Sequence, residues 1–401
     1  MQANAKLHHT MYSNIYLRKG KDQSLRRFHP WVFSGAIAKH GGELKEGDIV
    51  RVIDCDGECL GVGHYQVGSI AVRMLSFRDI VIDEKFWFCR ISAALELRRN
   101  QGVIREDNNM FRLVHGEGDQ LPGLIVDIYA NAAVMQAHSV GMHMQRQEIA
   151  DTLRKLLPNL ECIYYKSETT LPYKANLSEE TGFLYGKPMD LVAIENGLQF
   201  QIDWLKGQKT GFFLDQRDNR ALIEQYAKGK KVINMFCYTG GFSVYALRGE
   251  AETVHSVDSS ERAIDVTDAN VALNFPNHSR HQSFATDAFK YLNEMDNSYD
   301  LIVLDPPAFA KHRDALHNAL KGYTRLNAKA MQKIKPGGIL FTFSCSQAVN
   351  KDQFRLAVFT AAAQSNRFVR ILHQLHQPAD HPINIYHPEG EYLKGLVLEI
   401  E

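Results

Sequence analysis

Short hydrophobic runs separated by turn residues dominate the first part of the chain. Two β-rich runs lie on either side of Asp56 and Gly57, and the first of them is Ile49–Ile53. A further run is Val72–Leu75. An Asp-Gly pair between such runs is typical of a β-hairpin. We therefore expect a small all-β domain over residues 1–78, in which residues 1–11 form a flexible tail.

The spacing of hydrophobic residues changes after residue 78. Apolar side chains recur at helical intervals between Glu84 and Asn100, and a second helical stripe runs from Ile149 to Leu157. Leu124–Ile128 and Ala132–Met135 are short apolar runs of the length of strands. These patterns predict a central α+β domain over residues 79–190.

Strands and helices alternate over residues 191–401, which we take as a third domain. The pattern predicts a helix at Leu316–Ile334 and strands at Lys231–Phe236, Thr253–Asp258, His281–Ala285, Tyr299–Asp305 and Ile339–Ser344. Such alternation is typical of an α/β fold with a Rossmann-like, doubly wound and mostly parallel sheet. Val369–Leu375 and Leu393–Ile400 are expected to form a final antiparallel pair. Ligands of such sheets bind at the carboxyl ends of the strands.

The chain is neutral as a whole, because 46 Lys and Arg residues balance 46 Asp and Glu residues. This balance excludes a uniformly basic coat for nucleic acid, but it leaves room for a local basic face. Arg18–His29 holds five basic residues against one acidic residue, and Lys311–Lys335 holds seven against one. We interpret both tracts as a track for phosphates, with solvated faces as the alternative. The candidate contacts are Arg18, Lys19, Arg26, Arg27 and Lys311.

The sequence shows no sign of export or membrane insertion. Met1–Met11 lacks the apolar run of a signal peptide, and no stretch approaches the ~18 apolar residues of a membrane span. The six cysteines are irregularly spaced, and no second ligand pair accompanies Cys55 and Cys59 to hold zinc. We expect a reduced, cytoplasmic protein without a metal site or a membrane partner.

A glycine-rich turn follows the first strand of the last domain. Tyr238–Ser243 reads Y-T-G-G-F-S, which lacks the G-x-G-x-x-G of dinucleotide binding and the G-K-[ST] of a P-loop. Asp258 ends the next strand, where a carboxylate can accept hydrogen bonds from ribose hydroxyls. The expected ligand is a nucleoside without a diphosphate, commonly S-adenosylmethionine; an ordinary turn is the alternative. The candidate cofactor residues of the turn are Phe236, Tyr238, Thr239, Gly240 and Gly241.

Three further residues are candidates for the same ligand. Asp287 follows the third strand and suits either an adenine amino group or the N-cap of a helix. Gln216 and Arg220 lie at a predicted helix start before the first strand. They could reach the cofactor carboxylate, or they could belong to a solvated helix face.

The segment LIVLDPPAFAK is the strongest local signal. An apolar strand ends in Asp305, and Pro306 and Pro307 then force an extended turn at the carboxyl edge of the sheet. Asp305 is a candidate both for cofactor binding and for polarising a target base. Pro306, Pro307 and Phe309 are candidates for holding that base.

Cys345 ends the next predicted strand, and we expect it to lie beside Asp305. Carbon 5 of a pyrimidine is a poor nucleophile, but a thiolate that adds to carbon 6 makes carbon 5 enamine-like and able to accept a methyl group. This is covalent catalysis by an activated nucleophile. The thiol needs an activating neighbour, for which Lys311 is a candidate. The alternative role of a lone cysteine is that of a buried small hydrophobe.

With these residues, the chain resembles the bacterial 23S ribosomal RNA cytosine-5 methyltransferases that carry an N-terminal PUA domain. The matching segments are LRKGKDQSLRRFHPWVFSGAI, RLVHGEGDQLPGLIVD, TGFFLDQRDNR, NMFCYTGGFSVYA, LDPPAFAK, FSCSQ and HPEGEYLKGLVLEI. This resemblance covers nearly the whole chain. It implies an RNA-binding PUA module, a linker domain and a class I methyltransferase domain.

The resemblance also implies roles for residues. It implies S-adenosylmethionine binding by Tyr238–Gly241, Asp258 and Asp287, and it makes Cys345 the nucleophile. Many RNA cytosine-5 methyltransferases carry a second cysteine in a D-x-P-C motif, where this chain has Ala308. The motif therefore does not identify the group that removes the carbon-5 proton.

The expected activity is methyl transfer to carbon 5 of a cytosine in 23S rRNA, whether free, in a precursor particle or in the large ribosomal subunit. Uridine-5 methylation uses the same thiol chemistry, and guanine methylation is a further reading that needs no thiol. A non-catalytic RNA-binding assembly factor would retain the fold without binding the cofactor. A homodimer is compatible with the sequence, which carries no signal for oligomeric state.

Overall fold

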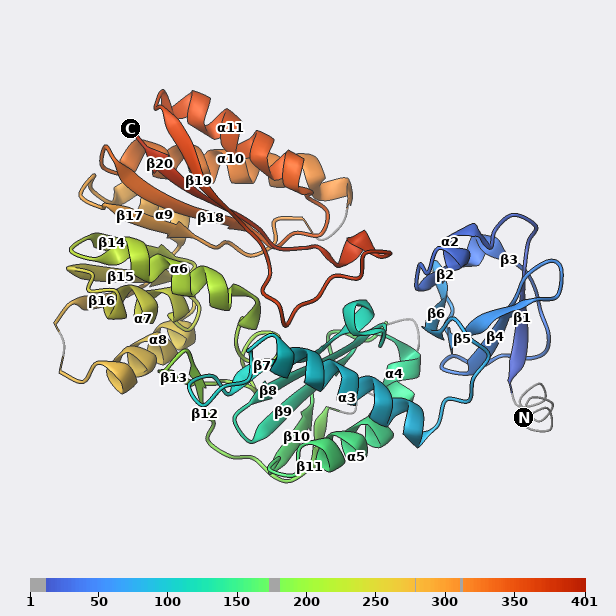
Figure 1. The fold of residues 1–401 in the computed structure, drawn as a ribbon. Helices are drawn as coiled ribbons and strands as arrows, with labels where there is room; N and C mark the ends of the chain where they lie inside the picture. Colours follow the sequence, from blue (N-terminus) through green and yellow to red (C-terminus); the bar gives the residue numbers. More distant parts are fainter. Residues whose placement is uncertain (1–11, 173–180, 278, 311–312) are drawn as a thin grey trace. The chain divides into compact units, whose positions relative to one another are not determined.

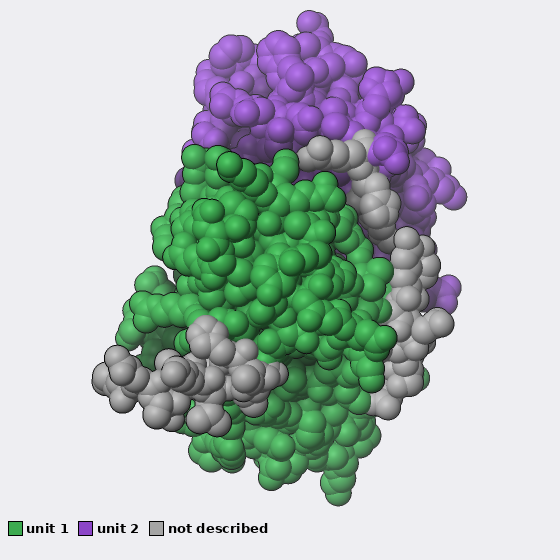
Figure 2. Space-filling view, turned by 90° about the vertical axis from the view of Figure 1, so that its right-hand side faces the viewer, with its two compact units in different colours: residues 1–191, 203–211, 379–390 green, residues 192–202, 212–378, 391–401 purple. Residues whose placement is uncertain are grey.

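The computed structural model describes residues 12–172, 181–277, 279–310 and 313–401 (Figure 1). The chain divides into two compact units (Figure 2). Unit 1 consists of residues 1–191, 203–211 and 379–390, and unit 2 consists of residues 192–202, 212–378 and 391–401. The predicted tail at residues 1–11 and the candidate Lys311 lie outside the described residues. In the described ranges, no helix is both long enough and apolar enough to cross a membrane.

A six-stranded sheet opens unit 1. The short helix α2 spans Gln23–Arg26, and the strands are β1 (Ser13–Leu17), β2 (Trp31–Phe33), β3 (Ile37–His40), β4 (Ile49–Ile53), β5 (Cys59–Tyr65) and β6 (Ile70–Ser76). They lie in the order β2-β6-β5-β4-β1-β3, and only β1 and β4 pair in parallel. Ile15, Val50 and Val72 are among the fully buried side chains of its core. The predicted β module is confirmed.

The predicted hairpin between β4 and β5 is confirmed, but its turn is longer than expected. It spans residues 54–58 instead of the two residues Asp56 and Gly57. The Asp54 carboxylate accepts hydrogen bonds from the backbone N–H groups of Asp56 (2.9 Å) and Glu58 (2.8 Å). An aspartate that binds the backbone two residues ahead builds its own turn, which explains the wider loop.

A second, five-stranded sheet follows in unit 1, in the order β11-β10-β9-β8-β7. Its elements are α3 (Glu84–Asn100), β7 (Met110–His115), β8 (Leu124–Tyr129), β9 (Ala132–Ala137), α4 (Val140–Met144), α5 (Arg146–Leu156), β10 (Cys162–Tyr165) and β11 (Gly182–Tyr185). α3 has the predicted bounds, and it begins where the Asp83 carboxylate accepts a hydrogen bond from the Phe86 N–H. Trp87 and Ile91 of α3 lie fully buried in the core under this sheet. The predicted α+β character of this region is confirmed.

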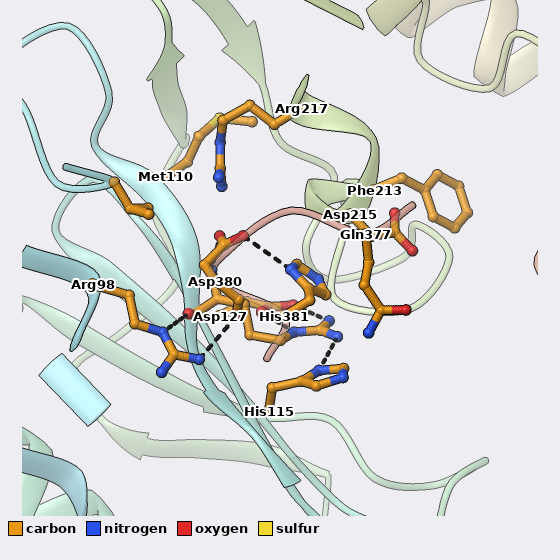
Figure 3. Close-up of polar contacts among 12 residues, drawn as sticks. Arg98, Met110, His115, Asp127, Phe213, Asp215, Arg217, Gln377, Asp380 and His381 are labelled. Carbon is orange, nitrogen blue, oxygen red and sulfur yellow. Dashed lines mark hydrogen bonds and ion pairs between the residues drawn. The ribbon is translucent and has the colours of Figure 1, made fainter. Parts of the chain in front are cut away.

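Two segments that we expected in the last domain belong to unit 1. The hydroxyl of Thr210 donates a hydrogen bond of 2.6 Å to Asp127 on β8. Asp380 accepts a hydrogen bond of 3.0 Å from the backbone N–H of Arg112, and the buried Arg98 donates one of 2.8 Å to the Asp380 carbonyl (Figure 3). These contacts join residues more than 80 positions apart, so no local pattern in the sequence could indicate them.

Unit 2 is built on a seven-stranded sheet in the order β16-β15-β14-β17-β18-β20-β19. Its strands are β14 (Lys231–Met235), β15 (Thr253–Asp258), β16 (His281–Ala285), β17 (Leu301–Leu304), β18 (Gly338–Ser344), β19 (Val369–Leu375) and β20 (Lys394–Ile400). The first five are parallel, and β20 runs antiparallel to both β18 and β19. The predicted doubly wound sheet and its final antiparallel pair are confirmed. A separate hairpin joins β12 (Val192–Glu195) to β13 (Leu198–Gln201).

Helices flank this sheet, as expected for a doubly wound fold. They are α6 (Arg217–Ala227), α7 (Gly241–Arg248), α8 (Glu261–Asn274), α9 (Ala288–Glu294), α10 (Leu316–Lys333) and α11 (Lys351–Ser365). Side chains of α9, α10 and α11 share one buried core with the strands. The strand order reverses between β14 and β17, and such a switch point is where ligands of open α/β sheets bind. The ends of β14, β15, β17 and β18 carry the predicted site residues.

Candidate active site

The turn after β14 has a strained backbone. Phe236 and Tyr238 adopt positive φ angles of 60° and 49°, which side-chain-bearing residues rarely do. Gly240 has φ +77°, and a Cβ atom there would lie 2.6 Å from Cγ2 of Thr267. Glycine is therefore required at position 240 by both conformation and space. Strain of this kind is concentrated at functional sites, where the surrounding structure maintains it.

Helix α8 holds this turn through side chains of its buried face. The Thr267 hydroxyl donates a hydrogen bond of 2.8 Å to the Tyr238 carbonyl, and the Asn270 amide donates one of 2.9 Å to the Thr239 carbonyl. Cys237 is buried in the turn, and burial raises the pKa of its thiol. Cys237 therefore packs in the turn, as expected, and has no nucleophilic character.

Asp258 lies at the end of β15, beside the turn. One carboxylate oxygen accepts a hydrogen bond of 3.0 Å from the Tyr238 N–H, and the other accepts one of 3.0 Å from the Ser260 N–H. The side chain keeps partial access to solvent, so each oxygen retains a lone pair for a ligand. The structure brings Asp258 and the glycine-rich turn together, as predicted.

Asp287 is exposed and caps α9. Its carboxylate accepts a hydrogen bond of 2.8 Å from the Lys290 N–H. The N-cap alternative is therefore confirmed. This role leaves the second oxygen available, so a contact with the adenine amino group stays a prediction.

The two candidates on the segment before β14 have different surroundings. The amide of Gln216 donates a hydrogen bond of 3.0 Å to Asp305 and in turn accepts one of 2.6 Å from Asn219. Arg220 is buried, and its guanidinium binds both oxygens of Glu195 at 2.8 and 2.7 Å and the Phe213 carbonyl at 2.9 Å. Arg220 also lies directly behind Gly241, where a Cβ atom would approach its side chain to 2.9 Å. Arg220 thus supports the turn from behind. Both Gln216 and Arg220 are buried, so the alternative of a solvated helix face is wrong, and their contact with the cofactor carboxylate stays a prediction.

Asp305 follows β17 and carries an unusual carboxyl group. Burial raises its pKa to about 7, and the charge of nearby Asp215 contributes to the rise, while the Gln216 hydrogen bond opposes it. The side chain keeps partial access to solvent. At neutral pH this carboxyl is therefore poised between a proton donor and an acceptor. A titratable group with such a pKa in a ligand-binding region is a candidate for catalysis.

Cys345 follows β18 and lies beside the turn that begins at Asp305. Its thiol lies 4.0 Å from the carbonyl oxygen of Pro306, the residue after Asp305. The neighbouring serines hold the strand end: Ser344 donates a hydrogen bond of 2.9 Å to Tyr323, and Ser346 donates one of 2.6 Å to the Ala310 carbonyl. Cys345 keeps partial access to solvent. The predicted proximity of Cys345 and the Asp305 turn is confirmed.

The sequence reasoning missed Lys394, which lies close to this thiol, and the contacts that extend from it through Tyr392 to Asp215. Lys394, at the start of β20, donates hydrogen bonds to the carbonyls of Ser346 (2.6 Å) and Tyr392 (2.7 Å) and is only 4 % exposed. The Tyr392 hydroxyl donates one of 2.7 Å to Asp215. A lysine at the head of the apolar run LKGLVLEI is the signal that could have indicated a buried cation.

The candidate RNA contacts differ in whether their side chains are exposed and whether their charges are already paired within the protein. Arg18, Lys19 and Arg27 are exposed, whereas Arg26 binds the carboxylates of Asp22, Asp54 (2.6 Å) and Glu58 (2.8 Å). The charge of Arg26 is therefore compensated within the protein. Near Asp305, Pro307 is exposed, Pro306 is buried, and the Phe309 ring packs 4.6 Å from that of Tyr323.

Across the described ranges, no group of three or more His, Cys, Asp or Glu residues is arranged to hold a metal ion.

Comparisons with known proteins identify the family of the chain. The family model for S-adenosylmethionine-dependent methyltransferases matches residues 112–387, and the model for PUA-like domains matches residues 15–77. Ribosomal RNA large subunit methyltransferase I of Alteromonas mediterranea is 41 % identical over 97 % of this chain and 99 % of its own length. The protein of the same name from Aeromonas hydrophila is 42 % identical, with the same coverage.

Solved structures support the fold. The crystal structure of SMU.776 complexed with SAH superimposes with a TM-score of 0.82 at 21 % identity, covering 96 % of this chain and 99 % of that one. At this identity the likeness concerns the fold alone. The family match and the full-length relatives show that the chain belongs to the S-adenosylmethionine-dependent methyltransferases, in the group with a PUA-like domain that includes the ribosomal RNA large subunit methyltransferases I.

Proposed function

We propose that this methyltransferase modifies carbon 5 of a cytosine in 23S rRNA of the large ribosomal subunit, through a covalent adduct with Cys345. Its full-length relatives carry the name of large subunit ribosomal RNA methyltransferases, which supports the substrate. The observation that carries the base and the mechanism is the placement of the Cys345 thiol 4.0 Å from the Pro306 carbonyl, next to the poised carboxyl of Asp305.

The residues of the turn suit the cofactor. Gly240 lets the turn pack closely against Thr267 of α8 because it has no Cβ atom, and the Asp258 carboxylate is oriented by two backbone N–H groups to receive ribose hydroxyls. We assign cofactor binding to Phe236, Tyr238, Thr239, Gly240, Gly241 and Asp258, with Asp287 at the adenine and Gln216 and Asp305 nearby. When bound, S-adenosylmethionine supplies an electrophilic methyl group.

The chain's own residues activate the base. The Cys345 thiolate adds to carbon 6, a bond forms between sulfur and carbon, and the electron pair of the 5,6 double bond moves toward nitrogen 3. Protonated Asp305 donates a hydrogen bond to nitrogen 3 and so stabilises that charge. Carbon 5 becomes nucleophilic and accepts the methyl group. Loss of the carbon-5 proton to a base then restores the double bond and expels the thiolate.

The state of Asp305 favours cytosine over uracil. Nitrogen 3 of cytosine is an acceptor, whereas nitrogen 3 of uracil carries a hydrogen. A carboxyl with a pKa of about 7 is protonated for much of the time at neutral pH and can donate to an acceptor. A fully ionised carboxylate would suit uracil better, so the raised pKa argues for the cytosine reading.

We propose two RNA-binding regions, one at the edge of the active site in unit 2 and one on the PUA-like domain in unit 1. Pro307 and Phe309 are our candidates for holding the target base, and the exposed Arg18, Lys19 and Arg27 are our candidates for binding phosphates. Arg26 contributes less because its guanidinium binds three carboxylates.

Replacement of the thiol tests the proposal. Cys345→Ala should abolish methylation of a 23S rRNA transcript while leaving cofactor binding, measured by calorimetry, within about twofold. Cys89→Ala, an exposed cysteine on α3, is the matched control and should retain full activity. Full activity of Cys345→Ala would exclude the covalent mechanism. A missing calorimetric signal in the wild type would favour the non-catalytic assembly factor.

A further inference from the structure

A buried lysine without a counter-ion lies next to the proposed nucleophile. Lys394 pairs with Ser344 in the register between β20 and β18, one residue before Cys345. Its ammonium donates to two neutral carbonyls, those of Ser346 and Tyr392, and no carboxylate forms an ion pair with it in the part of the chain that the structure describes. Lysine has three N–H donors, so the third has no acceptor among these residues.

A buried cation without an opposite charge is energetically costly, and a protein keeps one where it has a use. The other cations around the strand ends of unit 2 differ: the neighbouring Lys351 is exposed and forms an ion pair with Glu391. Two acidic groups act on Lys394 electrostatically, Cys345 and Glu391. Glu391 already forms an ion pair with Lys351, which makes the thiolate of Cys345 the anion that Lys394 can stabilise. An ammonium close to a thiol favours the thiolate and so creates the nucleophile.

We propose that Lys394 is a positioning residue that holds Cys345 in its thiolate form. This inference rests on the proposed role of Cys345. It names a second candidate activator besides Lys311, which was expected from the sequence and lies outside the described residues. Burial lowers the pKa of Lys394 to about 8, and the charges of Cys345 and Glu391 oppose that shift, so the amine is still mostly charged at pH 7. The other titratable or charged groups around the pair are Tyr323, Asp305, Asp215, Glu391 and Lys351.

The thiol can be titrated without RNA or cofactor. The alkylation rate of Cys345 by iodoacetamide is measured from pH 5 to 10 with the modified peptide identified by mass spectrometry, and Cys89 serves as the internal control. In Lys394→Gln, the midpoint for Cys345 should rise by about one unit or more, because an opposite charge has been removed. Lys394→Arg should stay closer to the wild type, and the Cys89 midpoint should not move.

An unchanged Cys345 midpoint in Lys394→Gln would overturn the inference. If both variants fail to fold, the wild-type midpoint decides: it should lie below the ordinary thiol value of about 8.5, and a midpoint at or above it would contradict the role of Lys394. These outcomes are separate from the proposed function, whose failure would instead be seen as full methylation by Cys345→Ala.

A second observation concerns the outer surface of unit 2. A groove of about 610 Å³ runs between α10 and α11. Lys321, Arg325 and Lys329 of α10 line it, and they follow one another at intervals of four residues, so that they lie about 6 Å apart along one side of the helix. The side chains that α11 contributes are neutral and include Gln353 and Gln364, and no carboxylate lines the groove.

The charges of this row are uncompensated. None of the three cations forms an ion pair with a carboxylate in the described ranges, whereas Lys228, Lys335 and Arg370 on the same unit bind Glu250, Asp300 and Glu399. A row of unpaired cations with amide groups opposite suits a chain of phosphates. We infer that this groove binds the sugar-phosphate backbone of the RNA substrate, which again rests on the proposed function.

Salt dependence tests the groove. The affinity for a single-stranded 23S rRNA fragment is measured between 50 and 200 mM salt for a K321Q/R325Q/K329Q variant. Loss of three phosphate contacts should reduce the slope of log K against log salt by about 2. The control K228Q/K335Q/R370Q removes the same charge from ion-paired positions and should leave the slope near that of the wild type. Equal slopes in the two variants would exclude RNA binding in the groove and favour a protein partner there. If the wild type does not bind RNA, the proposed function itself would be refuted.

Discussion

Asp305 carries a partly buried carboxyl group whose raised pKa should cost the folded protein stability. Its folded-state pKa of about 7 lies above the value of 3.8 that an exposed aspartate has. Between these two pH values, the carboxyl is therefore protonated in the folded protein and ionised in the unfolded chain. The carboxyl causes no loss of stability below pH 4, and its cost grows as the pH rises from about 4 to about 7.

Asp305→Asn should remove this cost. We expect the variant to match the wild type at pH 4 and to be more stable by about 2 kcal/mol at pH 8, a value discounted because the group keeps some contact with water. The free energy of unfolding from urea titrations between pH 4 and 8 measures this. Asp265→Asn, at an exposed position of α8, serves as the control. A difference that is constant across the pH range would contradict the raised pKa.

Asp258 is a second single position that can be tested, because we propose that its carboxylate binds the cofactor ribose. Asp258→Ala should weaken S-adenosylmethionine binding about tenfold or more, since hydrogen bonds to a carboxylate contribute about 1.5–3 kcal/mol each. RNA affinity should change by less than about twofold. Calorimetry for the cofactor and filter binding for RNA measure the two, with Asp268→Ala on α8 as the control. Equal losses in both assays would indicate a merely structural role.

At the scale of elements, local sequence patterns were sufficient to predict the bounds of those helices and strands that depend on their own residues alone. The predicted bounds of α3, β15, β16 and β19 agree with the structure residue for residue, and the glycine-rich turn, Asp258 and the Asp305 turn meet at one sheet edge. The parallel topology that was expected from strand–helix alternation brings them together. Cys345 joined this edge for the same reason.

Contacts between distant segments could not be predicted in this way. Arg220 forms an ion pair with Glu195 on β12. Lys394 donates a hydrogen bond to Ser346 from a strand that begins 48 residues later. Residues 379–390 join unit 1 through Arg98 and Arg112. Each of these depends on pairings between segments that carry no local signal.

The turn after β14 supports a prediction at the same scale. Gly240→Ala should destabilise the protein by about 1–3 kcal/mol, because the added methyl group would meet Thr267 and φ is +77°. Gly337→Ala is the matched control, since Gly337 has a similar φ of +74° but its added methyl group would meet no other atom within 4 Å. Thermal unfolding measures both. A loss no greater than that of Gly337→Ala would show that the turn tolerates a side chain and that its close packing is not required.

At the scale of the whole molecule, neutrality conceals an uneven distribution of charge. Many basic residues, such as Arg26 and Lys335, bind carboxylates, whereas the row on α10 does not. Net charge alone would have argued against RNA, and the pairing of individual side chains reverses that conclusion. An enzyme with such a surface can dock selected faces on RNA without coating itself in it.

RNA binding by the intact protein should therefore depend steeply on salt. We expect the affinity for a 23S rRNA fragment to fall at least about tenfold between 50 and 200 mM salt. Fluorescence anisotropy with a labelled fragment measures this, and calorimetry of the cofactor in the same buffers should show little change. An affinity that does not change with salt would show that the basic residues do not contact the RNA phosphates.

The central claim is that Cys345 carries the methylation of carbon 5 of one cytosine in 23S rRNA, and mass mapping of that RNA tests it most directly. In cells that lack the gene, one 5-methylcytosine should be missing from 23S rRNA. A plasmid that encodes the wild type should restore it, and one that encodes Cys345→Ala at an equal protein level should not. An unchanged cytosine methylation pattern, a missing methyl group on a uridine or guanine instead, or restoration by Cys345→Ala would contradict the account.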